Sequence, residues 1–292
     1  MTCACASNGS TAISARVTID SHQHFWRYSA GEYPWMTEPL AALRRDYLPA
    51  DLAPERARTS VDASIAVQAR QSLEESRWLL GLAENDPSIA GVVGWVDLQD
   101  ERVAGQLAPL AAQRKFVGVR HVVQDEPEDN FMLRPAFLRG IGRLREFGLT
   151  YDLLTFPRQL RAAIAVVRRF PEQPFVLDHL GKPFIKRGEL SPWREEFREL
   201  ARSPNVMCKL SGMVTEADWR AWKPEDFRPY LDEAWSAFGE DRLMFGSDWP
   251  VCTLAGNYAQ GHALVADFLT QFAEPARAKV MGANASRFYG LK

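Results

Sequence analysis

Short runs of β-branched and other apolar residues alternate with helix-period stretches along almost the whole chain. The runs lie near residues 17–24, 63–69, 91–97, 116–122, 149–155, 174–180, 205–211 and 242–248. Alternation of this kind predicts βα units and a parallel sheet. Eight strands with helical returns favour an α/β fold of the (β/α)8 type, a TIM barrel, over an open doubly wound sheet, and 292 residues suit a single domain of this type.

The sequence also marks the ends of two helices and one long connection. Ser72 and Glu75 stand three residues apart at the start of an amphipathic stretch over 72–84, which predicts a capping box. A second helix begins near Arg134 and ends at Gly148, a residue suited to a helix C-terminus. The connection over 25–62 is rich in aromatic residues and prolines, so we expect it to arch over the barrel mouth as a lid or wall.

Composition and charge narrow the class of ligand. The chain has 35 basic and 37 acidic residues, well interspersed, and a formal net charge of −2. Charges this evenly mixed form no strongly positive region that would attract nucleic acid or anionic lipid. No apolar run is long enough to span a membrane. We therefore expect a small neutral or weakly charged molecule as the partner, and we leave open whether the protein forms a homo-oligomer.

The start of the chain differs from the rest. Residues 1–15 are small, polar and aperiodic, so we expect a flexible N-terminal tail followed by one barrel domain over 16–292. The four cysteines form no paired framework, and residues 1–15 lack the basic and apolar regions of a secretory signal. We therefore expect a cytoplasmic protein with reduced thiols. Glycine-rich motifs for dinucleotides or nucleoside triphosphates are missing after the first predicted strand.

Polar residues gather where the predicted strands end, the place where TIM-barrel enzymes carry their chemistry. They are His22, His24, Gln68, Arg70, Trp95, Asp97, Arg120, His121, Tyr151, Asp152, Asp178, His179, Lys209, Ser211 and Asp248. Four of the five histidines fall at these ends. This clustering favours a functional site over scattered structural imidazoles.

His22, His24 and Asp248 have the clearest chemistry. Residues two apart on a strand point the same way, so His22 and His24 can hold one metal ion or one substrate oxygen together. Asp248 ends another apolar run and suits a general base or a metal ligand, with His179 as a further imidazole. Each residue also has a purely structural alternative. Asp248 can be an ordinary turn aspartate, and the His179 imidazole can simply pack between strands.

Several other side chains are candidates for contact with a ligand. We expect Arg120, Arg70, Tyr151 and His121 to bind substrate, although each of them can instead satisfy a neighbouring polar group. Tryptophans near the same rim can form a stacking wall for a sugar ring or can be ordinary core residues. They are Trp26, Trp35, Trp95 and Trp249, and we expect Trp26 and Trp35 to contact the ligand.

These motifs together resemble the amidohydrolase superfamily, in its amidohydrolase-2 branch. The similarity rests on Asp20-Ser-His-Gln-His-Phe-Trp26, Phe116-Val-Gly-Val-Arg-His121, Phe175-Val-Leu-Asp-His-Leu-Gly-Lys-Pro183, Lys209-Leu-Ser-Gly212, Phe245-Gly-Ser-Asp-Trp-Pro250 and Asn284-Ala-Ser-Arg-Phe-Tyr-Gly290. Trp26 directly after the histidine pair, with Tyr33-Pro-Trp-Met36, is most similar to the group of L-fuconolactonases and L-rhamnonolactonases. The resemblance implies a TIM-barrel hydrolase that opens a sugar-acid lactone.

The chain departs from the family's metal-binding pattern at one point. Members with a firm metal site carry a further histidine or a carbamylated lysine, whereas the strand after His179 offers Lys209-Leu-Ser211. The resemblance therefore implies either no required metal or one weakly bound divalent ion, zinc or manganese. Its ligands would be His22, His24 and Asp248, together with His179.

Our leading hypothesis is hydrolysis of an aldonolactone, such as an L-fuconolactone, to the open-chain acid. Asp248 would act as general base, and His22, His24 and His179 would hold the oxyanion, helped by a metal ion or, without one, by a protonated imidazole or Arg120. Alternatives are a metal-dependent decarboxylase or an amide or dicarboxylate-lactone hydrolase on the same fold, and a non-catalytic sugar-binding barrel. A glycosidase would need two acids across a cleft and leaves the histidines without a role.

Overall fold

The computed structural model describes residues 17–291, so the tail predicted over 1–15 lies outside the described residues. Parallel strands form one eight-stranded sheet in the order β1-β2-β3-β4-β5-β6-β7-β8. They are β1 (Ile19–Gln23), β2 (Ala63–Val67), β3 (Ile89–Gly94), β4 (Phe116–His121), β5 (Thr150–Leu153), β6 (Phe175–Leu177), β7 (Val206–Leu210) and β8 (Leu243–Phe245). All eight predicted strands are present, each shorter than or close to its predicted run.

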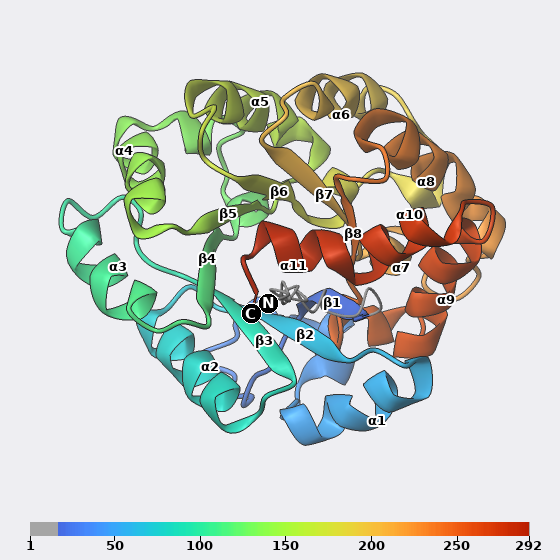
Figure 1. The fold of residues 1–292 in the computed structure, drawn as a ribbon, viewed down its shortest axis with the longest axis horizontal. Coiled ribbons are helices and arrows are strands. Elements are labelled where there is room, and N and C mark those ends of the chain that lie inside the picture. Colours follow the sequence, from blue (N-terminus) through green and yellow to red (C-terminus); the bar gives the residue numbers. More distant parts are fainter. Residues whose placement is uncertain (1–16, 292) are drawn as a thin grey trace, which may run out of the picture.

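Helices surround the sheet and return the chain from each strand to the next. They are α1 (Pro49–Thr59), α2 (Leu73–Asn85), α3 (Val103–Ala111), α4 (Pro135–Leu144), α5 (Leu160–Arg169), α6 (Trp193–Ala201), α7 (Met213–Glu216), α8 (Pro224–Phe238), α9 (Tyr258–Leu269), α10 (Glu274–Ala278) and α11 (Asn284–Phe288). Figure 1 shows the strands at the centre and the helices as an outer ring. The prediction of a single-domain (β/α)8 barrel is confirmed.

The barrel is closed by a seam between β1 and the residues that follow β8. The Ser21 hydroxyl donates to the carbonyl of Phe245 at 2.6 Å, and the amide of Asp248 donates to the carbonyl of His22 at 2.8 Å. A bridge between Gln23 and Trp249 continues the seam. The backbone therefore brings the histidine pair and Asp248 together although they are more than 220 residues apart.

Side chains of β6 and β7 alternate between the barrel interior and the helix layer, as the two-residue period of a strand requires. Val176 and Met207 belong to the interior cluster, whereas Leu177 and Cys208 pack in the outer layer. Continuing that alternation places Asp178 and Lys209 inside the barrel, near its C-terminal end. The barrel interior is therefore apolar around Val176 and Met207 and charged at the C-terminal ends of the strands, where Asp178 and Lys209 lie.

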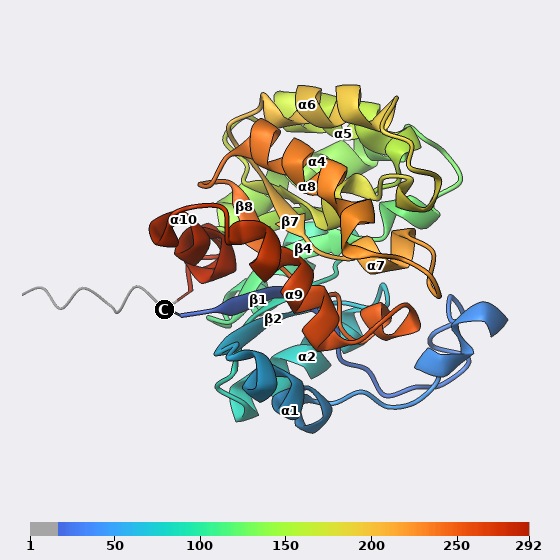
Figure 2. The ribbon, with the colours of Figure 1, turned by 90° about the vertical axis from the view of Figure 1, so that its right-hand side faces the viewer.

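The two ends of the barrel are finished differently. Helix α11 lies across the N-terminal end, where Tyr289 joins the interior cluster (Figure 1). At the opposite end the connection between β1 and α1, which includes a 3-10 helix over Glu38–Leu43, stands out from the body of the barrel (Figure 2). Within residues 17–291, no helix is long and apolar enough to cross a membrane.

The predicted C-terminus of the second helix is confirmed, whereas only part of the predicted capping box at the start of α2 is present. Gly148 ends the second helix with a left-handed φ of 67°, a conformation that glycine adopts without strain. Ser72 caps α2 by accepting the amide of Glu75 at 3.0 Å. The Glu75 carboxylate does not complete a capping box, because it instead accepts the amides of Ala69 and Arg70 and the hydroxyl of Tyr33.

Candidate active site

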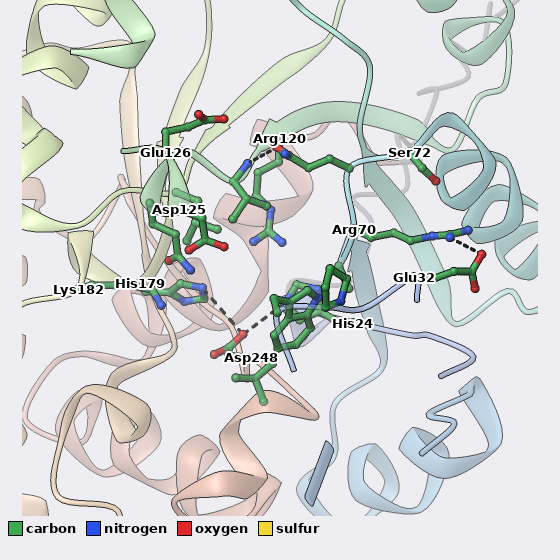
Figure 3. Close-up of a pocket in the computed structure, with 18 of the residues that line it drawn as sticks. His24, Glu32, Arg70, Ser72, Arg120, Asp125, Glu126, His179, Lys182 and Asp248 are labelled. Atoms are coloured by element: carbon green, nitrogen blue, oxygen red, sulfur yellow. Dashed lines mark hydrogen bonds and ion pairs between the residues drawn. The ribbon is translucent and has the colours of Figure 1, made fainter. Parts of the chain in front are cut away.

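A pocket of about 620 Å³ opens at the C-terminal end of the barrel. That volume lies within the range of about 300–1,000 Å³ typical of small-molecule sites. Its lining comes from strand ends and from the loops that follow them: His24, Gly31, Glu32, Pro34, Trp35, Ala69, Arg70, Gln71, Ser72, Arg120, Val122, Gln124, Asp125, Glu126, Leu154, His179, Lys182, Asp248 and Val251. Figure 3 shows Asp248 between His24 and His179 in this pocket.

Asp248, His24 and His179 line the pocket, and the fully buried His22 ring lies against all three. Asp248 Oδ1 lies 3.4 Å from His24 Nε2 and 3.8 Å from the Nε2 atoms of both His22 and His179. His22 Nε2 and His24 Nε2 are 3.2 Å apart, so the two histidines do face the same side, as predicted. One carboxylate oxygen therefore meets three ring nitrogens in a buried space.

The backbone around Asp248 is held in an uncommon conformation. Asp248 has a left-handed φ of 57°, which costs energy in a residue with a side chain. Buried Asp20 accepts the amide and the hydroxyl of Ser247 at 2.8 and 2.5 Å and the hydroxyl of Tyr258 at 3.0 Å. This set of bonds fixes the turn after β8 and directs the Asp248 side chain toward the histidines.

His179 is held in a comparable way after β6. Its φ is 54°, and its Nδ1 lies 2.8 Å from the Ser211 hydroxyl, which leaves Nε2 facing Asp248. The ring fits because residue 212 is glycine: a Cβ there would stand 2.4 Å from His179 Nδ1. The glycine after Ser211 is thus required by the close approach of the imidazole.

A group of charged side chains lies beneath the three imidazoles, and we call Asp152, Asp178 and Lys209 the charge cluster. Lys209 Nζ lies 2.5 Å from Asp152 Oδ2 and 2.9 Å from Asp178 Oδ1. Arg120 Nη1 pairs with Asp178 Oδ2 at 3.2 Å, and Tyr289 donates to Asp152 at 2.9 Å from the other end of the barrel. All three members of the cluster are fully buried, so each charge has a partner rather than water.

Burial and charge set the protonation of the reacting groups. Burial lowers the pKa of both His22 and His179 well below the ordinary value, so both rings are neutral near pH 7. Burial alone would raise the pKa of Asp248, but His179 and His24 outweigh it and hold that pKa below its usual value. Asp248 is therefore ionised at neutral pH. The expected protonated imidazole is not available in His22 or His179.

The same residues have the chemistry of a metal site. Ligand atoms of His22, His24 and Asp248 all lie within 4.8 Å of one another. His24 Nδ1 lies 2.8 Å from the carbonyl of Val67, so this nitrogen carries the proton and Nε2 keeps its lone pair. These three residues could hold one divalent ion. The group of His22, Asp178 and His179 does not suit a second ion, since Lys209 and Arg120 already take the Asp178 oxygens.

Residues 31–35 form one side of the pocket mouth, and we call this segment the wall. Glu32 lies 2.5 Å from Arg70, and Tyr33 donates to buried Glu75 at 3.1 Å. The Trp35 ring stands edge-on to Trp26 at 5.9 Å, and it is the one member of the predicted tryptophan group that lines the pocket. The expectation that 25–62 supplies a wall at the barrel mouth therefore agrees with the position of residues 31–35.

Other predicted ligand-contacting residues lie outside the pocket lining. Trp26 is fully buried under the wall, where its indole N–H donates to the carbonyl of Arg45 at 2.8 Å. His121 and Tyr151 each neighbour an inward residue on a strand, Arg120 and Asp152, and therefore point outward. His121 stacks on Phe131 and Tyr151 packs among Phe137 and Phe175. Trp95 and Trp249 do not line the pocket either, so the four tryptophans do not form a common stacking wall.

The reacting groups were predicted from the sequence, but several residues around them were not. Lys182 lines the pocket and pairs with Glu216 at 3.3 Å. Glu32 belongs to the wall, and Asp20 holds the turn that carries Asp248. Lys182 and Asp20 both lie within motifs that carry the family resemblance, which is the signal that could have found them. Glu32 lies in an aperiodic segment with no such signal.

The barrel and the His–Asp group at its mouth define an enzyme class, a (β/α)8 protein with its reactive residues at the C-terminal ends of the strands. The chain belongs to the amidohydrolase family, whose model matches residues 19–291. The resemblance predicted from the motifs is therefore confirmed over nearly the whole chain.

Curated relatives cover almost the full length of the chain. An L-fucono-1,5-lactonase of Burkholderia multivorans is 44% identical over 94% of this chain and 96% of its own length. A second L-fucono-1,5-lactonase, of Burkholderia ambifaria, is 39% identical over 94% of this chain and 95% of its own. A crystal structure of an amidohydrolase from Burkholderia multivorans with bound zinc has a TM-score of 0.91 at 44% identity, covering 94% of this chain and 100% of that one.

Proposed function

We propose that this protein hydrolyses a neutral sugar-acid lactone, of the L-fucono-1,5-lactone kind, to the open-chain acid. The observation that carries the proposal is Asp248, an ionised carboxylate with one oxygen among three imidazoles at the bottom of an open pocket. Binding alone has no use for a base in that position. The two relatives named as L-fucono-1,5-lactonases support the choice of substrate.

The proposed reaction follows from the positions of these side chains. Asp248 takes a proton from water, and the resulting hydroxide adds to the lactone carbonyl. Arg120 and a ring N–H of neutral His179 stabilise the oxyanion that forms. The tetrahedral intermediate then breaks the bond to the ring oxygen, and Asp248 returns its proton to that leaving oxygen. Atoms balance with water as the only co-reactant and without a covalent enzyme intermediate.

The charges of the pocket favour an uncharged ring over a carboxylated one. Arg120, Arg70 and Lys182 line the pocket, and each already pairs with a carboxylate: Asp178, Glu32 and Glu216 respectively. A dicarboxylate lactone needs guanidinium groups that are free to bind it. The dicarboxylate and decarboxylase alternatives are therefore less well supported than a neutral lactone.

A metal ion is a possible addition to this site rather than a step in the proposed reaction. His24, Asp248 and His22 would hold it, with His179 beside them, and a bound zinc or manganese ion would supply Lewis-acid polarisation of a carbonyl. We propose that such an ion is weakly bound and not required. The similar Burkholderia multivorans amidohydrolase structure contains bound zinc, which supports divalent-ion binding by a protein of this kind.

The experiment that tests the function is a substrate panel followed by pH change as acid is released. Neutral 1,4- and 1,5-aldonolactones, including L-fuconolactone, should be hydrolysed with higher kcat/KM than carboxylated pyrone lactones. A higher kcat/KM for carboxylated lactones would contradict the argument from paired charges. No turnover of any lactone by folded protein would contradict the proposed function itself.

A further inference from the structure

Three basic side chains line the pocket, and they differ in how firmly their carboxylate partners are built into the barrel. Arg120 pairs with Asp178, which is fully buried and is also bound by Lys209, so this pair belongs to the charge cluster. Arg70 pairs with Glu32, which is half-exposed, and water and salt weaken such a pair. The third basic side chain has a partner of neither kind.

Lys182 is that third side chain, and its partner comes from outside the pocket lining. Lys182 Nζ lies 3.3 Å from Glu216 Oε1, and the two side chains are only 16% and 20% exposed. Glu216 is the last residue of α7, the short helix after β7, and it does not line the pocket. Within residues 17–291, no other carboxylate lies within ion-pair distance of Lys182. The charge that Lys182 presents to a ligand therefore depends on this one neighbour.

The backbone holds Lys182 near the reacting groups. Lys182 has a left-handed φ of 54°, and its amide donates to the carbonyl of His179 at 2.8 Å. Figure 3 shows Lys182 and His179 on one side of the pocket, across from Arg70. His179 Nε2 lies 3.8 Å from Asp248 Oδ1. Lys182 therefore belongs to the end of the pocket that contains the reacting residues.

A paired and an unpaired ammonium group select different ligands. An ammonium group without a carboxylate partner attracts a ligand carboxylate strongly in a partly buried place, because little water screens the two charges. With Glu216 in position, a ligand carboxylate that approaches Lys182 also meets a charge of its own sign. A neutral lactone does not experience this repulsion, since its hydroxyl and carbonyl groups carry only dipoles.

We propose that Glu216 is a selectivity-determining residue that acts through Lys182. By pairing with Lys182 from outside the pocket lining, Glu216 disfavours lactones that carry a carboxylate and so favours neutral sugar lactones. The inference rests on the proposed function, because it names the residue that produces the preference for uncharged rings. Loss of the Glu216 charge alone should therefore convert Lys182 into a binding site for a ligand carboxylate.

The test compares two lactones with the same ring that differ in one group. L-Galactono-1,4-lactone ends in a hydroxymethyl group, and galactaro-1,4-lactone ends in a carboxylate instead. In Glu216→Gln, the ratio of kcat/KM for the carboxylated lactone to kcat/KM for the neutral one should rise by roughly three- to tenfold, the scale of an ion pair partly shielded from water. The rise should become smaller at high salt, because salt screens the added attraction.

The double variant Glu216→Gln/Lys182→Met shows whether Glu216 acts through Lys182. Without the ammonium group the ratio should return to the wild-type value or fall below it, which a purely structural role of Glu216 does not predict. Glu196→Gln is the matched control, because Glu196 is 15% exposed and pairs with Arg161 away from the pocket. If Glu216→Gln does not fold, Glu216→Asp should raise the ratio by a smaller factor, since its shorter side chain draws the carboxylate away from Lys182.

A measurement without turnover separates this inference from the proposed function. Galactarate and galactitol are unreactive open-chain ligands that differ only in their end groups, which are carboxylates in the first and hydroxymethyl groups in the second. NMR titration of the full-length protein should show the ratio of their dissociation constants shifting toward galactarate in Glu216→Gln, even if the wild type hydrolyses no lactone, a result that would contradict the proposed function alone. Unchanged preference in both assays overturns the role of Glu216, even if the wild type is an active lactonase. A shift that persists in the double variant overturns the role of Lys182.

Discussion

The charge cluster and the wall lie at the same end of the barrel but are built in opposite ways. Asp152, Asp178 and Lys209 sit on or next to strands, are fully buried and are held by the sheet itself. The wall belongs to a long connection, its Glu32 side chain is 49% exposed, and it is tied to the barrel through side-chain contacts with Arg70 and Glu75. The charge cluster is held by the sheet, whereas the wall is held by side-chain contacts, so we expect changes in the wall to have little effect on the barrel.

This difference separates the chemistry of the site from its selectivity. Positions on strand ends are fixed by backbone ladders, which suits reacting groups that need accurate placement. A loop-borne wall suits the part of the pocket that meets the remainder of the ligand. Changes near the charge cluster should therefore act on kcat, and changes in the wall should act mainly on KM.

The largest effect should come from Asp248→Asn, which keeps the size of the side chain but cannot take a proton. Turnover of the preferred lactone should fall by about three orders of magnitude, the scale for a base that also orients the attacking water. Steady-state kinetics would measure this, with circular dichroism to confirm the fold. Asp232→Asn is the matched control, since Asp232 is an exposed carboxylate that pairs with Arg228 and does not line the pocket. More than about a tenth of wild-type turnover in Asp248→Asn would contradict the proposed base.

Trp35→Ala tests the wall. We expect a smaller effect than that of Asp248→Asn, and we expect it in KM rather than in kcat. Loss of an aromatic surface worth about 0.5–1.5 kcal/mol should raise KM by roughly two- to tenfold, with little change in kcat, because stacking is felt in ground and transition states alike. Trp219→Ala is the control, because Trp219 is 37% exposed and does not line this pocket. A decrease in kcat without a change in KM would place Trp35 with the chemistry and remove the distinction between the two regions.

The same difference explains how much could be predicted from the sequence. Strands and reacting residues were predictable because a two-residue period and polar strand ends are local signals, and the seam between β1 and Asp248 follows once the barrel closes. The last predicted strand, over 242–248, ends at Phe245 because the residues leading to Asp248 enter a left-handed turn. That turn depends on Asp20, far away in the sequence.

The neighbours of the reacting groups were less predictable for a physical reason. Tyr151 and His121 end strands as Asp152 and Arg120 do, but a shift of one residue places a side chain in the helix layer instead of the barrel. Trp26 and Trp35 both belong to the aromatic segment after β1, and packing alone decides that one is buried and the other lines the pocket. These are tertiary choices that no local pattern of the chain specifies.

Glu75 allows the support of the wall to be tested through pH. Burial raises its pKa to about 7 from an ordinary 4.5, so between those values the native protein binds more protons at Glu75 than the unfolded chain does. The contribution of Glu75 to stability should therefore be highest at low pH and decline as pH rises through 7. Thermal unfolding from about pH 5 to about pH 8 should show a shallower decline of Tm in Glu75→Gln than in the wild type. Equal slopes would mean that Glu75 does not titrate in this range.

Metal removal should have the smallest effect, because the region beneath the site already contains its own cations. Lys209 and Arg120 face Asp152 and Asp178, so the buried carboxylates are compensated without an added ion. We therefore expect protein treated with a chelator and shown by elemental analysis to be free of metal to keep lactonase activity within about twofold of the untreated enzyme. Protein carried through the same steps without chelator is the control. Complete loss of activity that Zn²⁺ or Mn²⁺ restores would show that Asp248 and its imidazoles need an ion, and that the charge cluster does not replace it.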